Sequence, residues 1–163
     1  IMSYNVLDVS RYIINYCNEN YYLISNLKLQ KILYFVQAFF LEAKNEECFR
    51  EEIEAWDFGP VVPEVYREYR KYGGNNIPPI EEYIDKSRGI WHAVTKEFDV
   101  NIISESDREL INQMVNECSG YSASELVEIT HRQSPWINAY IKGFNNVISK
   151  EDISEYFRGI LNG

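Results

Sequence analysis

Residues 54–73, EAWDFGPVVPEVYREYRKYG, join an extended segment to a short helix and decide how the rest of the chain is arranged. Side chains alternate in character along residues 53–58, which predicts a short strand with Trp56 and Phe58 on one face. Gly59-Pro60 is predicted to end this strand, because glycine and proline mark turns. The chain is expected to turn there into the helix.

The helix that follows has both a start signal and a stop signal. Pro63 suits its first turn, where the missing N–H has no intrahelical partner, and Gly73 suits the position just past its end, where positive φ is needed. Its apolar face is rich in tyrosine and consists of Val62, Val65, Tyr66, Tyr69 and Tyr72. Because tyrosine has a polar tip, much of this face can stay half wet.

Residues 27–43 are predicted to form the central helix of the fold, with Ser25 as its N-cap. Apolar residues cover most of its sides, and one stripe consists of Leu29, Ile32, Leu33, Val36 and Phe39. A helix that is apolar on most sides is buried on most sides.

The polar residues of this helix allow two interpretations. Gln30 and Gln37 lie two turns apart on one side, with Lys31 and Tyr34 beside them. They can form a hydrogen-bond network inside the protein, since buried polar groups are usually paired. A polar strip along an otherwise buried helix can also face a partner.

Signals for further helices surround this segment. Val6, Val9 and Ile13 mark a helix near the N-terminus, and four more helices are predicted to begin at Ser106, Ser122, Ser134 and Ser149. Residues 80–104 give a mixed signal, from which we expect a β-hairpin partner for the Trp56 strand. The predicted fold class is mainly α (α+β), with about six helices around residues 27–43 and a small β element near residues 53–58.

Length and composition predict one domain over residues 1–163, with a net charge of −9 and a pI near 4.8. This negative net charge argues against direct binding to nucleic acid, which needs clustered Lys and Arg. The three cysteines have no CxxC spacing, so we expect neither disulfides nor a metal site. Without a signal peptide or a long apolar run, we expect a cytoplasmic protein with no membrane contact. No cofactor is expected, since glycine-rich nucleotide-binding motifs are lacking.

His131 is the one candidate for catalysis. Glu128 lies three residues before it on the same predicted helix, but no nucleophile motif accompanies the pair. A histidine at a helix end that bonds the last carbonyl groups is the competing interpretation.

Several segments, in the same order along the chain, resemble the Panacea family of SocA-like, phage-associated proteins. The matching segments are KLQKILYFVQ at residues 28–37, EAW at residues 54–56, GPVVP at residues 59–63 with Tyr66, Tyr72-Gly73, and residues 126–136. The resemblance stops between about residues 79 and 104. It marks as structural motif positions Lys28, Gln30, Tyr34, Gly59, Pro60, Pro63, Gly73, Thr130, His131, Pro135 and Trp136.

The resemblance implies an antitoxin-type domain, not an enzyme, that neutralises a protein toxin by binding it. Some relatives act as adaptors to a cytoplasmic protease, which is a second way to remove the toxin. We expect the binding surface to include Lys31, Gln37, Trp56, Tyr66 and Tyr69. Two alternatives stay open: an acidic mimic of nucleic acid that acts as an inhibitor, and a small hydrolase that uses His131 with Glu128.

Overall fold

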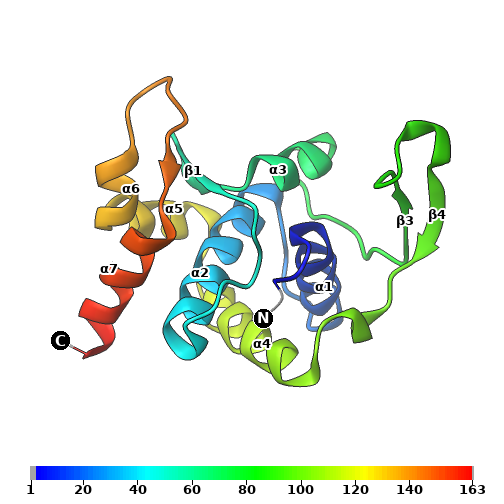
Figure 1. Cartoon of the computed structure of the whole chain (residues 1–163), viewed down its shortest axis with the longest axis horizontal. Helices are drawn as coiled ribbons and strands as arrows, with labels where there is room; N and C mark the ends of the chain where they lie inside the picture. The colour runs from blue at the N-terminus through cyan, green and yellow to red at the C-terminus, as the bar shows by residue number, and fades with distance from the viewer. Residues whose placement is uncertain (1–2, 163) are drawn as a thin grey trace.

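Helix α2 (Asn26–Lys44) runs through the centre of the protein, and the rest of the chain is arranged around it (Figure 1). The computed structural model describes residues 3–162, and of residues 161 and 162 only the backbone. The Ser25 hydroxyl accepts from the Lys28 N–H, so the helix begins where the sequence predicts. Leu29, Ile32 and Leu33 are fully buried, whereas Phe39 is only half-buried.

Four other long helices pack against α2. They are α1 (Val6–Glu19), α4 (Glu105–Ser119), α5 (Ala123–His131) and α7 (Lys150–Asn162). The capping box predicted at Ser122 is present, with Glu125 as its second member. Helix α4 is capped two residues before the predicted start at Ser106. The hydroxyl of Ser104 caps it by accepting from the Asp107 N–H.

A small antiparallel sheet lies beside the first half of α2. Its strand order is β2 (Gly59–Val61), β1 (Ile53–Trp56), β5 (Val147–Ile148). The prediction that Gly59-Pro60 ends the extended run is wrong, because both residues belong to β2 and the turn is made at residues 57–58. The expected hairpin partner from residues 80–104 is also wrong, since β1 pairs with β2 and β5 instead.

The short helix after β2 matches its predicted boundaries. Helix α3 (Pro63–Tyr69) has Pro63 at its first position and continues as the 3₁₀ turn η1 (Arg70–Tyr72). Gly73 then adopts a φ of 57°, the left-handed conformation that its place after the helix requires. Helix α6 (Ser134–Ala139) is a second short helix, and its Pro135 is buried.

Residues 81–97 form a projecting arm rather than part of the sheet, and the chain returns to the core at the fully buried Ile103 (Figure 1). Strand β3 (Glu82–Asp85) pairs only with β4 (Val94–Glu97) among the described residues, with the 3₁₀ turn η2 (Ile90–His92) between them. Residues 100–102, within the segment that gave the mixed signal, form the 3₁₀ turn η3 (Val100–Ile102). The mainly α fold with a small β element around α2 is nevertheless confirmed.

Candidate functional site

The polar side chains of α2 hold the segment that runs from the end of α2 to α3. Gln37 accepts from the Cys48 N–H at 2.7 Å and donates to the Phe49 carbonyl at 2.9 Å. Gln30 accepts from the Val62 N–H at 2.9 Å. Both glutamines therefore satisfy main-chain groups that would otherwise be buried without a partner.

The hydrogen bonds continue toward the start of α3. Gln30 donates to the Asn26 side-chain oxygen at 2.9 Å, and the Asn26 amide donates to the Tyr66 carbonyl at 3.1 Å. At the other side of the helix, the Tyr34 hydroxyl donates to the Gln133 side chain at 2.7 Å. The interpretation of the polar strip as an internal network is confirmed for these side chains.

Lys31 lies at the crossing of α2, β2 and α5. Its side chain is fully buried, and Nζ donates to the Pro60 carbonyl oxygen at 2.8 Å. Burial lowers the pKa of Lys31 to about 7, because a charged amine loses its hydration inside the protein. None of the ion pairs between described residues includes this amine.

Gly59 leaves room for this lysine. Its φ is 97°, and an added Cβ would lie 2.7 Å from Thr130 Oγ1 and 3.0 Å from Lys31 Cε. The Thr130 hydroxyl itself donates to the Val127 carbonyl at 2.8 Å. Three motif positions from β2, α2 and α5 therefore depend on one another for packing.

A stack of three rings supports the turn between β1 and β2. The ring of His131 lies 4.1 Å from that of Trp136, which lies 4.4 Å from that of Tyr140. Trp136 Nε1 donates to the Trp56 carbonyl at 2.9 Å. The Tyr140 hydroxyl donates to the Asp57 carboxylate at 2.6 Å, which raises the pKa of Tyr140.

His131 thereby has a different role from both of those expected. Its Nε2 lies 3.0 Å from the carbonyl oxygen of Asp57, so it bonds the hairpin turn and not the last carbonyls of its own helix. Within the described structure the Glu128 side chain makes no hydrogen bond to His131, and Glu128 is exposed. The geometry shows a positioning role for His131 and assembles no acid–base pair around it.

A hollow of about 450 Å³, here called the aromatic groove, opens next to these anchored elements. Residues from the start of α2, the β1–β2 hairpin, α3 with its 3₁₀ extension, and the loop before β5 line it. They are Asn26, Leu27, Gln30, Trp56, Asp57, Phe58, Val61, Tyr66, Arg70, Gly73, Gly143 and Asn145. In Figure 1 the loop before β5 (orange) passes next to the β1–β2 hairpin. Segments from the middle and from the last part of the chain therefore meet at the groove.

Two of the five predicted surface residues form a wall of the aromatic groove. The rings of Trp56 and Tyr66 meet edge to face at 5.0 Å, and Trp56 Nε1 donates to Glu54 at 2.9 Å. Phe58 at the hairpin turn is 66% exposed. An aromatic wall beside an exposed phenylalanine gives the groove a largely apolar lining.

The other three predicted surface residues are inside the protein, and their assignment to an exposed surface is wrong. Lys31 and Gln37 are fully buried, and Tyr69 is 3% exposed. The polar groups of Lys31 and Gln37 satisfy main-chain partners, and burial raises the pKa of Tyr69. The polar character of Lys31 and Gln37 reflects internal hydrogen bonding.

The remaining motif position on α2 is half-buried. The Lys28 amine donates to the Tyr121 carbonyl at 2.7 Å, which ties α2 to the connection between α4 and α5. It does not line the aromatic groove.

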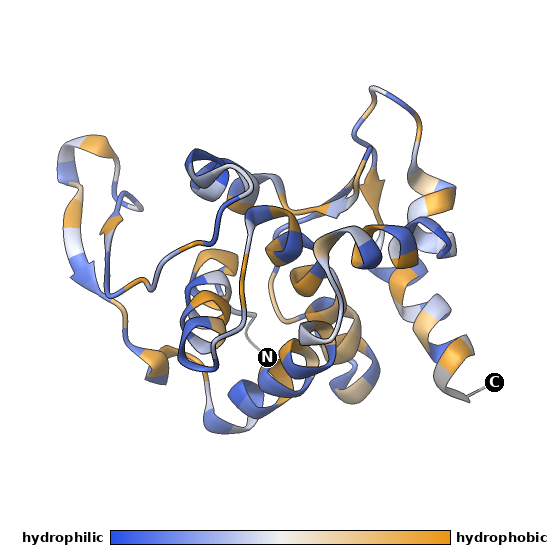
Figure 2. Ribbon diagram, turned by 180° about the vertical axis from the view of Figure 1, so that it is seen from behind, coloured by the Kyte–Doolittle hydropathy of each residue, from blue (hydrophilic) through white to orange (hydrophobic). Residues whose placement is uncertain are grey.

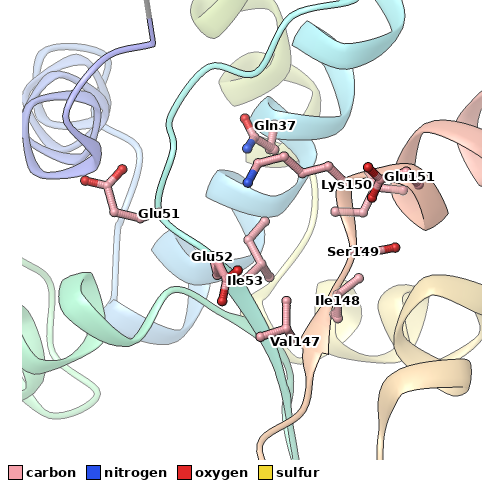
Figure 3. Close-up of a pocket in the computed structure, with 10 residues that line it drawn as sticks. Gln37, Glu51, Glu52, Ile53, Val147, Ile148, Ser149, Lys150 and Glu151 are labelled. Carbon is pink, nitrogen blue, oxygen red and sulfur yellow. The ribbon is translucent and has the colours of Figure 1, made fainter.

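A second, smaller hollow of about 220 Å³ lies at the other edge of the sheet (Figure 3). Figure 3 shows Glu52 and Ile53 on one side of it and Val147 and Ile148 on the paired strand. Gln37 contributes to its lining, although its amide is already bonded to the main chain. This hollow has no exposed aromatic side chain and brings none of the other predicted residues together.

The wall that comes from the loop before β5 was not predicted from the sequence. Gly143 and Asn145 both have positive φ there, at 83° and 49°. Gly143 and the Asn145-Asn146 pair are turn signals, but which part of the chain the turn would contact depends on long-range strand pairing. Asn26 and Leu27 lie at the beginning of the central helix, and their position in the groove was not predicted.

Residues 3–162 contain no group of three or more His, Cys, Asp or Glu that could hold a metal ion. None of their helices has the length and apolar character needed to cross a membrane.

The fold and the aromatic groove define a mainly α-helical domain with a concave, aromatic-lined surface of the kind that takes up another molecule. The chain belongs to the Antitoxin SocA-like, Panacea domain family, whose family model matches residues 29–137. Antitoxin SocA of Caulobacter vibrioides (strain NA1000 / CB15N) is 37% identical to it over 116 residues. That similarity covers 69% of this chain and 58% of the relative, so the chain matches less than two thirds of the relative's length. No solved structure matches the chain.

Proposed function

We propose that this protein is an antitoxin that neutralises a protein toxin by binding a segment of it in the aromatic groove. The observation that carries the proposal is the position of Trp56 and Tyr66, which share one wall of the groove and lie within the matched range. The relative's name supports an antitoxin role. The binding mode is inferred from the groove itself.

The groove has the size and chemistry of a binding site for protein side chains. Its volume of about 450 Å³ accommodates a few large side chains of a partner. Trp and Tyr dominate the residues that contribute most to protein–protein binding, because they bury a large area with little loss of entropy. Phe58 gives the toxin segment an exposed apolar contact at the rim.

The anchored walls favour binding without large rearrangement. Trp136 and His131 fix the turn that carries Phe58, and Asn26 fixes the start of the helix that carries Tyr66. Elements already held in place lose little conformational entropy when a partner binds. We therefore assign to Trp56 and Tyr66 contact with the toxin, and to Lys31, Gln37 and Tyr69 support of the groove from inside.

The experiment that tests this proposal is co-expression with the product of the reading frame next to this gene. A toxic product that the protein neutralises should copurify with it. Phe58→Ala and Tyr66→Ala should weaken that capture by roughly thirtyfold, the equivalent of an aromatic hot spot of about 2 kcal/mol. Tyr21→Ala is the matched control, because Tyr21 is an exposed tyrosine that does not line the groove.

The result also separates two modes of neutralisation in the cytoplasm. If the protein masks the toxin, the toxin persists at a steady level in the complex. If it delivers the toxin to a cytoplasmic protease, the toxin's half-life shortens when the protein is present and recovers in a protease-deficient host. Full neutralisation by the Phe58→Ala and Tyr66→Ala double variant would remove the groove from the proposal.

A further inference from the structure

The β3–β4 hairpin stands away from the helices, with β4 as its outermost strand (Figures 1 and 2). All four residues of β4 are exposed, whereas β3 alternates between exposed and half-buried residues. One contact to the helices is made on the β3 side, where the Arg11 guanidinium lies 3.5 Å from the centre of the Tyr83 ring. Within residues 3–162 no third strand pairs with this sheet, so β4 presents an open edge.

The hairpin also exposes apolar side chains. Trp91 in η2 is 93% exposed, and Ile90, Ile84 and Val94 are exposed as well. Figure 2 shows hydrophobic colour at the tip of the hairpin and hydrophilic colour at the base of β4. In β4 itself only Val94 is apolar, and the other exposed apolar residues lie beside the strand. A cluster of exposed large apolar side chains next to an open strand edge marks a site of interaction.

Charges on the hairpin indicate what kind of partner fits. Glu82 and Glu97 lie directly opposite each other in the strand register. Lys96 is paired with Asp85 at 2.6 Å, and no described ion pair includes Glu82 or Glu97. Like charges in opposite positions are destabilising, and a cation placed between them relieves the repulsion.

We propose that the open edge of β4 binds an extended, basic segment of a partner protein, which adds a third strand to the hairpin. Strand addition satisfies the outward-facing main-chain groups of β4. A Lys or Arg of the segment pairs with Glu97 and lowers its repulsion with Glu82, and the apolar side chains of the segment cover Val94 and the Trp91 tip.

The same charges disfavour two other occupants. A second copy of this chain carries the same net charge of −9 and would place its own glutamate pair near the first. Nucleic acid is repelled by the carboxylates at the base of the hairpin. This surface is separate from the aromatic groove, so the inference does not depend on the proposed antitoxin function.

The test uses a short blocked peptide of alternating lysine and valine as the probe. We expect it to bind the full chain, to protect the outward-facing main-chain amides of β4 from hydrogen exchange, and to shift the Trp91 fluorescence to shorter wavelength. A peptide with the same side chains but methylated backbone nitrogens keeps the charge and cannot extend the sheet. It should bind at least roughly tenfold more weakly, because strand addition depends on main-chain hydrogen bonds.

Two variants complete the test. Glu97→Lys should reduce peptide affinity by roughly tenfold or more, since it replaces attraction with repulsion at the open edge. Glu155→Lys is the matched control, because it changes the net charge equally on exposed surface of α7 and should leave affinity unchanged. Equal losses in both variants, equal binding of the methylated peptide, or absence of protection at residues 94–97 would each overturn the proposal. So would a dimer in sedimentation experiments that Trp91→Ser abolishes.

Discussion

The amine of Lys31 lies 2.8 Å from the carbonyl oxygen of Pro60, fully enclosed by α2, β2 and α5. A main-chain carbonyl accepts this hydrogen bond but supplies no formal negative charge. The protein therefore holds a lysine whose pKa, lowered to about 7 by burial, lets it lose its proton within the physiological range.

Lys31 is predicted to make stability depend on pH. An unfolded lysine titrates near 10.4, so between pH 7 and that value the unfolded chain binds one more proton than the folded chain at this site. The contribution of Lys31 to the free energy of unfolding therefore rises by roughly 1.4 kcal/mol per pH unit in this window. Below pH 7 the contribution is constant, because the lysine is charged in both states.

The measurement is the difference in free energy of unfolding between Lys31→Met and the unchanged protein, taken from denaturant titrations between pH 7 and pH 9. The stability of the unchanged protein relative to the variant should increase with pH. Comparing the two proteins removes the opposite effect of the buried cysteines, whose thiol pKa values burial raises. A difference that does not change with pH would show that Lys31 keeps its charge.

Gly59→Ala is predicted to destabilise the protein through both strain and collision. The φ of 97° is unfavourable for alanine, and the new Cβ would lie 2.7 Å from Thr130 Oγ1. We expect a loss of about 3 kcal/mol or more. Gly143→Ala separates the two effects, since Gly143 also has positive φ but an added Cβ would meet nothing within 4 Å. Gly143→Ala should lower the free energy of unfolding by only about 1–2 kcal/mol, measured by thermal or chemical denaturation.

Leu33→Ala tests the central position of α2. Leu33 is fully buried, so its truncation should lower the free energy of unfolding by roughly 2–5 kcal/mol. The control is Leu23→Ala, at an exposed leucine just before the helix. This variant should change the free energy of unfolding by less than about 0.5 kcal/mol. Similar denaturation midpoints for the two variants would contradict the described core.

Tyr69→Ala and Tyr66→Ala are predicted to have different effects, although both residues belong to α3. Tyr69 is buried, and its loss should reduce stability by about 3–5 kcal/mol. Tyr66 lines the aromatic groove, and its loss should leave the melting temperature within a few degrees while weakening toxin capture. A calorimetric scan and a capture assay on both variants distinguish the roles. Equal destabilisation by both would place Tyr66 in the core.

Local signals predicted much of the helical structure. Ser25, Ser122 and Pro63 each mark a helix start through hydrogen bonding or backbone geometry within one turn, so neighbouring sequence is sufficient. Ser104 was missed because Ser106 shows the same pattern two residues later, and only the preceding chain path determines which serine acts as the cap. The pairing of β1 with β5 was missed because β5 comes from a distant part of the chain.

The candidate site could be predicted only in part. Trp56 and Tyr66 stand out by alternation and helical spacing, and both reach the groove. Lys31 and Gln37 looked like surface residues because sequence shows that a side chain is polar, not that a main-chain group nearby needs a partner. The wall from Gly143 and Asn145 depends on how β5 docks, which no local pattern specifies.

Placing β5 at the edge of a sheet whose other strands come from the middle of the chain has a consequence during synthesis. The third strand can pair only when Ile148 is available to pair with Ile53. The loop that forms one wall of the aromatic groove directly precedes this strand. On the ribosome, α2 and the β1–β2 hairpin emerge long before this wall is made. The groove is thus completed only after residue 148 has left the ribosome, later than α2 and the hairpin that form its other walls.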